Sequence, residues 1–198
     1  MTTAVTADRT RWGAVVAVAL GSVLAGLDLT VVAVALPGIG TDLGVSPASA
    51  QWVMLGYLLP MVALSIPAGR WLDLAAPRAA FLLATAGFGM SSVLIALAPD
   101  FALVLAGRAL QGVFGSLLGA LAMPVIGETV RPEHRARAMS IVLTLLPLSS
   151  AAGPALGGLL TEAFGWRSVF LINIPLAVAA AWAGLRSIPR RSQGLPPP

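Results

Sequence analysis

The sequence predicts an all-α integral membrane protein that is a bundle of six transmembrane helices. Its 198 residues contain six apolar segments of about 18 to 26 residues, separated by short polar segments. A helix of about 20 residues crosses the hydrocarbon layer of a bilayer. Only 10% of the residues are charged and 58% are hydrophobic, whereas an average soluble domain is about 25% charged. The expected helices are Gly13–Pro37, Gln51–Ala68, Ala79–Ala98, Phe101–Ile126, Ala136–Leu160 and Ser168–Leu185.

The distribution of arginine predicts how this bundle is oriented. The chain has no lysine, and ten of its twelve arginines lie in the two tails and in the second and fourth connections between helices. They are Arg9, Arg11, Arg70, Arg78, Arg131, Arg135, Arg137, Arg186, Arg190 and Arg191. An excess of arginine marks the cytoplasmic side, so we expect a multi-pass protein of the cell membrane with both termini in the cytoplasm. Of the other two, Arg167 lies in an external connection and Arg108 inside a helix.

The same reasoning divides the chain into three parts. We expect a cytoplasmic N-terminal tail over residues 1–12, a six-helix domain over 13–187, and a cytoplasmic tail over 188–198 that ends in three prolines. A proline-rich segment of this kind is typical of a linker, so it could begin a connection between domains.

Proline, glycine and polar residues mark the expected ends of the first three helices. The first helix should end at Pro37, before a polar external loop. The second should begin near Trp52, because an indole suits the depth of the membrane interface. A cytoplasmic loop over Gly69–Pro77 should follow, and the third helix should end before a tight external turn at Pro99-Asp100.

The last three helices are bounded in the same way. The fourth helix should be followed by a cytoplasmic loop over Glu128–Arg137, the most polar segment of the chain. The fifth should end near Glu162, and Gly165-Trp166-Arg167 should precede the sixth.

A weak internal repeat relates the second and fifth helices. Leu58-Leu59-Pro60 matches Leu145-Leu146-Pro147, and seven residues after each of these prolines comes another, Pro67 or Pro154. Seven residues are about two helical turns, so each proline pair lies on one face. The match predicts a three-plus-three helix repeat. The alternative is chance, since the chain contains 15 prolines.

Two charged residues inside apolar helices are the main candidates for a site. Asp28 lies in the first helix and Arg108 in the fourth, and a charge at mid-membrane costs roughly 2.5–3.5 kcal/mol on insertion scales. Because the two helices run in opposite directions, both residues fall at a similar depth. They could share one polar cavity with Gln111, which lies on the face of Arg108, and could form an ion pair. The alternative is an architectural pair that fixes helix packing.

A carboxylate at such a position could carry a proton. A nonpolar environment favours its protonated form and a nearby arginine favours its ionised form. Opening the cavity to one side, or the arrival of a substrate, could shift this balance. Asp28, Arg108 and Gln111 are therefore candidates for proton coupling and for lining a substrate cavity.

Small residues in the fifth helix predict close helix packing. Gly153 and Gly157 form a small-x-x-x-small face that lets another helix approach, and Pro154 should bend the helix. Gly158 extends this pattern. Ordinary tight packing is the alternative.

Other polar residues have weaker interpretations. Gly69, Asp73 and Arg78 lie in the expected second connection, where charges can bridge to helix ends or serve only to set the topology. Asn173 is interpreted as an interhelical hydrogen-bonding residue, and His134 as a solvated surface residue.

The composition excludes several chemistries. Without lysine the chain cannot form a phosphate-binding loop of the G-x-x-x-x-G-K-[ST] type. Without cysteine it has no disulfide, thiolate metal site or thiol nucleophile. Despite the net charge of +4, the arginines form no basic stripe, so we expect no nucleic-acid partner. With no nucleophile–base set or cluster of metal ligands, we expect neither an enzyme nor a metal site.

Together these motifs resemble the N-terminal six-helix half of a transporter of the major facilitator superfamily, closest to the fourteen-helix drug:proton antiporters. The resemblance covers nearly the whole chain and is carried by six segments: Leu27–Pro37, Gln51-Trp52, Tyr57–Leu59, Arg108–Gly112, Ser149–Gly158 and Gly165–Pro175. Ala33 stands where the family usually has asparagine, and Ser149 stands in place of a leading glycine. The loop motif keeps Gly69, Asp73 and Arg78 but has Leu74 and Ala76 at family positions for a basic residue and a glycine.

The resemblance implies export of small amphipathic compounds by alternating access, driven by the proton gradient without a cofactor. Asp28 and Arg108 would take part in coupling. The loop motif would help latch two halves of the transporter, and the Gly-Pro segment of the fifth helix would shape the interface between them. The implied partners are the lipid bilayer, a small-molecule cargo and a second half, supplied by another copy or another chain. The alternatives are an exchanger or uptake transporter for a polar metabolite, or a truncated membrane remnant or scaffold without transport.

Overall fold

The computed structural model describes residues 10–190, and every regular element in that part of the chain is a helix, so the all-α class is confirmed. The helices are α1 (Trp12–Asp42), α2 (Pro47–Ala50), α3 (Trp52–Leu74), α4 (Pro77–Ala96), α5 (Phe101–Ala120), α6 (Ala122–Thr129), α7 (Pro132–Phe164), α8 (Ser168–Leu171) and α9 (Asn173–Ser187). Helix α2 continues into α3, α5 into α6, and α8 into α9, so that these three pairs together with α1, α4 and α7 form six spans of membrane length in the described residues. Residues 1–9 and 191–198 of the expected tails lie outside the described residues.

Most of the spans are longer than the sequence predicted, and α1 is the first example. We expected it to end at Pro37, but it continues to Asp42. A proline removes one backbone hydrogen bond from a helix, and here the next turn is held because Ile39 is fully buried in the core.

The two cytoplasmic loops predicted between helices are correspondingly short. Most of the segment 69–77 belongs to α3, which buries Leu72 in the core near its end. Most of the segment 128–137 belongs to α6 and α7, and only residues 130 and 131 separate them. The Arg135 guanidinium donates to the backbone oxygens of Gly127 and Val130 at 2.7 and 3.1 Å. These bonds cap the end of α6, so this connection needs no longer loop.

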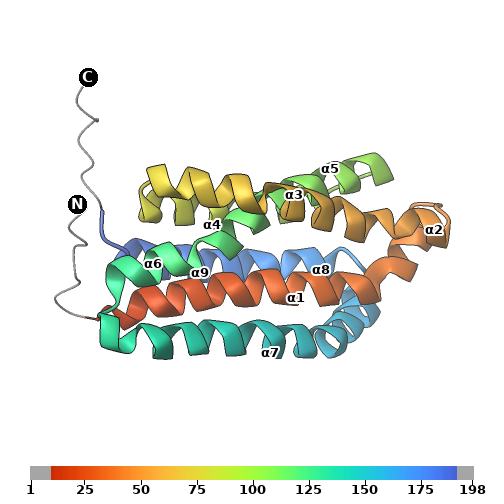
Figure 1. The fold of residues 1–198 in the computed structure, drawn as a ribbon. Helices are drawn as coiled ribbons and strands as arrows, with labels where there is room; N and C mark the ends of the chain where they lie inside the picture. The colour runs from red at the N-terminus through yellow and green to blue at the C-terminus, as the bar shows by residue number, and fades with distance from the viewer. Residues whose placement is uncertain (1–9, 191–198) are drawn as a thin grey trace, which may run out of the picture.

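The packing of the helices follows the three-plus-three repeat that the prolines predicted. The most extensive contacts are those of α1 with α7 and of α3 with α5, followed by those of α4 with α5 and of α1 with α9. A repeat that relates the first three spans to the last three makes α1 equivalent to α5, α3 to α7, and α4 to α9. The contact of α1 with α7 is then equivalent to that of α5 with α3, and the contact of α4 with α5 to that of α9 with α1. In Figure 1, α1 and α9 lie between α7 on one side and α3 on the other.

The core consists of two apolar clusters, one toward each end of the bundle. The first includes Phe81 and Leu118, and the second includes Ile39 and Phe170. The boundary between them falls near the middle of α1 and α5 and in the second half of α4, where buried polar side chains are found. By contrast, α3 and α7 are the least buried spans. The arrangement therefore holds a polar layer at mid-depth, enclosed mainly by α1, α4, α5 and α9.

Candidate functional site

The polar layer is organised around an ion pair between α1 and α5. Arg108 Nη1 donates to Asp28 Oδ2 at 2.6 Å, and both side chains are 0% exposed. The structure therefore brings together the two charged residues that the sequence placed at similar depth. Arg108 also donates through Nε to the backbone oxygen of Val53 at 2.9 Å and through Nη1 to Gln111 Oε1 at 2.7 Å.

Two further side chains complete the network from α4 and α9. Asn173 Nδ2 donates to Asp28 Oδ1 at 2.7 Å. Gln111 Nε2 donates to Ser92 Oγ at 2.7 Å and lies 3.4 Å from Asp28 Oδ1. The participants come from pairs of helices that the repeat makes equivalent: α1 and α5 supply the charges, and α4 and α9 supply Ser92 and Asn173.

Aromatic rings enclose the guanidinium. Its central carbon lies 4.5 Å from the ring centre of Tyr57 and 5.9 Å from that of Phe170. Such rings attract a cation through their π-electron faces. They also exclude water, and a buried ion pair then depends on its hydrogen bonds to offset the loss of solvation.

The network is nearly but not fully satisfied. Among the described residues, three buried side-chain atoms lack a hydrogen-bond partner, and two of them, Arg108 Nη2 and Asn173 Oδ1, belong to this network. Unsatisfied buried polar groups are rare in stable cores and often mark functional sites. Chemically, the site offers a carboxylate that can bind a proton, a permanent cation beside it, and amides that can donate or accept.

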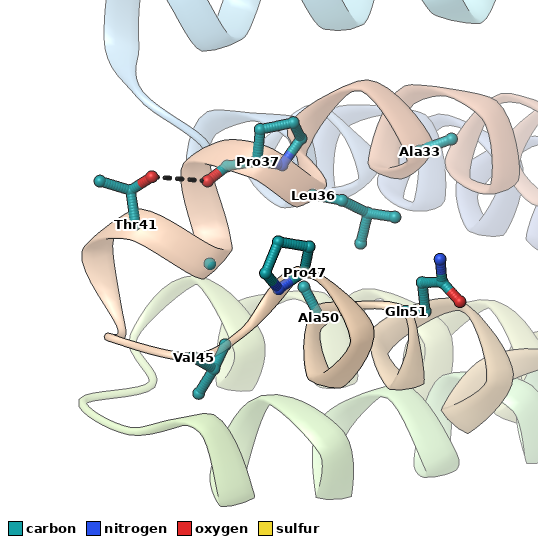
Figure 2. Close-up of a pocket in the computed structure, with 9 residues that line it drawn as sticks. Ala33, Leu36, Pro37, Thr41, Val45, Pro47, Ala50 and Gln51 are labelled. Atoms are coloured by element: carbon teal, nitrogen blue, oxygen red, sulfur yellow. Dashed lines mark hydrogen bonds between the residues drawn. The ribbon is translucent and has the colours of Figure 1, made fainter.

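The candidate cavity residues are all fully buried. Asp28, Arg108 and Gln111 are each 0% exposed, so none of them lines an open space in this conformation. An open cleft of about 530 Å³ lies elsewhere, between the end of α1 and the α2 region. Figure 2 shows its lining, which includes Leu36, Pro47 and Gln51, and the 2.9 Å bond from Thr41 Oγ1 to the Pro37 oxygen. The role of Asp28, Arg108 and Gln111 in lining a substrate cavity stays a prediction.

The small residues of α7 divide between two sides of that helix. Gly153 and Gly157 are buried, and a side chain added at either would meet Thr30 or Val31 of α1. The close helix approach expected at this motif therefore occurs within this half. Pro154 is exposed, and no atom lies within 4 Å of a side chain built at Gly158.

The residues expected in the second connection lie at two helix ends. Gly69 and Asp73 fall in the last turns of α3, and Arg78 falls in the first turn of α4. Neither Asp73 nor Arg78 takes part in an ion pair with another described residue. A latching role for these residues stays a prediction.

Sequence reasoning missed part of the site. Ser92 and Tyr57 received no role, whereas Asn173 was expected to form an interhelical hydrogen bond, and its bond to Asp28 confirms this. Serine is common in apolar helices, so no signal in the sequence separated Ser92 from the other serines. Tyr57 is the only tyrosine of the chain, but its residue type alone does not indicate that it faces a charge. Asn173 carried a signal, because an amide inside an apolar segment needs a partner.

Comparison with known proteins identifies what the chain is similar to. A sequence model described as the Major Facilitator Superfamily matches residues 18–198. A tetracenomycin C resistance and export protein from Streptomyces glaucescens is 40% identical over 174 residues, which are 88% of this chain and 32% of that protein. A methylenomycin A resistance protein from Bacillus subtilis is 33% identical, over 88% of this chain and 38% of its own length. The chain thus spans about a third of the length of these relatives.

Solved structures show the same fold. An inward-facing, unoccupied bacterial homolog of the human lysosomal transporter Spinster superposes with a TM-score of 0.76 at 23% identity, over 97% of this chain and 46% of that one. A D-xylose–proton symporter superposes with a TM-score of 0.73 at 16% identity, over 90% and 48%. In both cases the six helices match about half of a longer protein.

Proposed function

Because this chain belongs to the Major Facilitator Superfamily, we propose that it forms the N-terminal half of a transporter that exports small amphipathic compounds in exchange for protons. The second half would come from another copy or another chain, and the assembly would lie in the cell membrane with both ends of the half in the cytoplasm. Two kinds of support bear on this proposal: the buried site and the functions that the names of the relatives state.

The buried ion pair between Asp28 and Arg108 is the observation that carries the proposal. A charge at mid-membrane is costly. In this fold the ion pair joins α1 to α5, and Asp28 also accepts a hydrogen bond from Asn173 of α9. A scaffold could hold the same helices with apolar side chains, often with no loss of stability. A titratable group at the centre of the half is what proton coupling requires.

The ion pair suggests how a proton could change the conformation. When Asp28 is ionised, Arg108, Gln111 and Asn173 all direct donors at its carboxylate. A proton on Asp28 cancels its charge and weakens these contacts between α1, α5 and α9. Rocking of the two halves around a central site could then proceed, and release of the proton would restore the network.

The export direction and the cargo are inferred from the relatives. Their names refer to resistance to tetracenomycin C and to methylenomycin A, and the first is also named an export protein. We propose that the cargo of this transporter belongs to the same broad class of small, partly apolar compounds.

Transport in proteoliposomes tests the proposal. The chain, reconstituted with its second half, should move protons when an amphipathic dye or drug is added. This flux should be lost in Asp28→Asn and retained in Asp42→Asn, which removes an acid of the same helix that lies outside the network. If Asp28→Asn transports as well as the unchanged protein, Asp28 has no part in coupling. Native mass spectrometry of the purified assembly identifies whether the second half is a copy or another chain.

A further inference from the structure

The carboxamide of Asn173 is oriented by the charge of Asp28. Its Nδ2 lies 2.7 Å from Asp28 Oδ1 and 3.2 Å from Ser92 Oγ. An ionised carboxylate can only accept hydrogen bonds, so the amide atom that faces it must be the nitrogen. The amide oxygen is therefore left without a partner, although it is buried.

A proton on Asp28 Oδ1 would make this orientation unfavourable. That oxygen would then carry an O–H donor directed at the N–H donor of Asn173. A buried donor needs an acceptor, and the oxygen of Asn173 is held on the same carboxamide group as the nitrogen. Rotation of the amide by half a turn exchanges the two atoms and supplies that acceptor.

Of the two amides next to Asp28 Oδ1, Asn173 is the one held on one side only, through the bonds of its Nδ2 to Asp28 and, at 3.2 Å, to Ser92 Oγ. Gln111 is held at both ends, because its Oε1 accepts from Arg108 Nη1 and its Nε2 donates to Ser92 Oγ, each at 2.7 Å. Asn173 Oδ1 has no bond to lose. Asn173 is also the first residue of α9, directly after the break between α8 and α9, so a change in its bonding acts on a helix end.

We propose that Asn173 is a positioning residue that switches with the proton: its amide donates to ionised Asp28 and rotates to accept from protonated Asp28. In this step a hydronium ion transfers its proton to Asp28 Oδ1 and leaves as water, and the new O–H donates to Asn173 Oδ1. The switch rests on the proposed function, because it concerns the same proton. It specifies how α9, which carries Asn173, would respond to protonation.

Few other groups near Asp28 can titrate. Arg108 from α5 and Tyr57 from α3 are the charged and titratable side chains that face it among the described residues. Helices α4, α5 and α9 also contribute Ser92, Gln111 and Asn173, which do not titrate. The middle of α7, which packs on α1, has no titratable residue between residues 141 and 161. Arginine stays charged and a phenol loses its proton only in alkaline solution, so a response of Asn173 at acidic or neutral pH reports on Asp28.

The sequence makes this response directly measurable. Asn173 is the only asparagine in the chain, so isotope labelling of asparagine gives a single carboxamide signal in NMR. For the complete chain in lipid nanodiscs, we expect this signal to move between two positions as the pH falls. The midpoint should coincide with the appearance of the infrared band of protonated Asp28. Asp28→Gln keeps Asn173 as the only asparagine and should hold the signal at one position.

Two outcomes separate failure of the switch from failure of the proposed function. A carboxamide signal that stays fixed while Asp28 takes up a proton would overturn the switch alone. If Asp28 takes up no proton at any pH at which the chain stays folded, the switch and the proton-coupled function both fail.

A matched pair of variants tests the switch in transport. Asn173→Thr introduces a hydroxyl that can donate or accept according to its partner, whereas Asn173→Val has nearly the same shape and can do neither. In the reconstituted assembly we expect the threonine variant to keep the pH profile of proton-coupled transport, and the valine variant to lose most of the flux. Identical profiles for the two variants would show that Asn173 acts through packing, and would overturn the switch.

Discussion

At the scale of single residues, Arg108 can be fully buried because most of its donors are satisfied. Its Nε and Nη1 atoms reach a backbone oxygen, a carboxylate and an amide oxygen, and two aromatic rings face its guanidinium. Lysine would not reproduce these contacts, because its donors all lie on one nitrogen, whereas the planar guanidinium spreads its donors over separate nitrogens. These contacts therefore offset the free-energy cost of burying the charge, and removing one of them leaves that cost uncompensated.

Removing one charge of the pair should be more harmful than removing both. Arg108→Met leaves Asp28 buried without its countercharge, which typically costs about 3–5 kcal/mol. The double variant Asp28→Leu/Arg108→Met has no buried charge, so we expect it to recover at least half of that loss. Unfolding of the purified variants in detergent, followed by circular dichroism, gives the free energies.

The exposed ion pair between Asp42 and Arg167 provides the control for this comparison. Its side chains are 49% and 40% exposed, and surface pairs contribute about 1 kcal/mol or less. Arg167→Met should therefore change the free energy of unfolding only slightly. A double variant at positions 28 and 108 that is as unstable as Arg108→Met would refute the explanation by unpaired charge.

The residues of the site differ in how far the sequence could predict them. Asp28 and Arg108 stand out because charges are rare in apolar helices, and helix geometry placed them at similar depth. Gln111 follows from its spacing to Arg108. Ser92 and Tyr57 could not be found in this way, because only the packing of α3 and α4 against α5 decides which of their side chains face the charges.

At the scale of helices, the number of spans was predictable and their ends were not. Apolar length alone gave six spans, and all six are present in the described residues. The ends were misplaced because proline, glycine and arginine were interpreted as loop signals. In α1 and α3, prolines and glycines are accommodated within the helix. At the α6–α7 connection, Arg135 caps a helix end. Buried neighbours and capping side chains decide these points, and both depend on tertiary contacts.

Glycine on one face of α7 determines how closely α1 and α7 pack. A Cβ atom at Gly157 would lie 2.9 Å from the backbone oxygen of Val31 and 3.1 Å from its Cα, whereas one at Gly158 would meet no atom within 4 Å. We therefore expect Gly157→Ala to separate the helices and lower the free energy of unfolding by about 1–3 kcal/mol.

Gly158→Ala is the matched control. Alanine favours a helix over glycine by about 1 kcal/mol, so this variant should be neutral or slightly more stable in the same unfolding measurement. Equal destabilisation by the two alanines would mean that α7 does not contact α1 through the face that carries Gly157.

At the scale of the whole molecule, polar contacts tie together the connections at each end of the bundle. At one end, Arg167 and the indole nitrogen of Trp166 both donate to Asp42, and Arg167 also reaches the backbone oxygen of Ala98. At the other end, Thr10 contacts His134, which is half-buried rather than fully solvated as the sequence suggested. Figure 1 shows the start of α1, the end of α9 and the α6–α7 connection at this second end.

The two ends of the bundle differ most clearly in the number of arginines that they carry. Of the ten arginines among the described residues, Arg108 is inside the bundle, Arg167 is at the first end, and the remaining eight are at the second. The arginines at the second end are Arg11, Arg70, Arg78, Arg131, Arg135, Arg137, Arg186 and Arg190. Arginine-rich connections remain in the cytoplasm, so this asymmetry predicts one orientation of the bundle in the membrane.

Cysteine labelling tests that orientation without background, because the chain contains no cysteine. Ala48→Cys and Glu133→Cys place single thiols at exposed positions at the first and second ends, respectively. In intact cells a membrane-impermeant maleimide should label Ala48→Cys, and should label Glu133→Cys only after the cells are opened. The reverse pattern would place the eight arginines outside and contradict the charge argument. Labelling of both positions in intact cells would show that the chain does not adopt a single orientation.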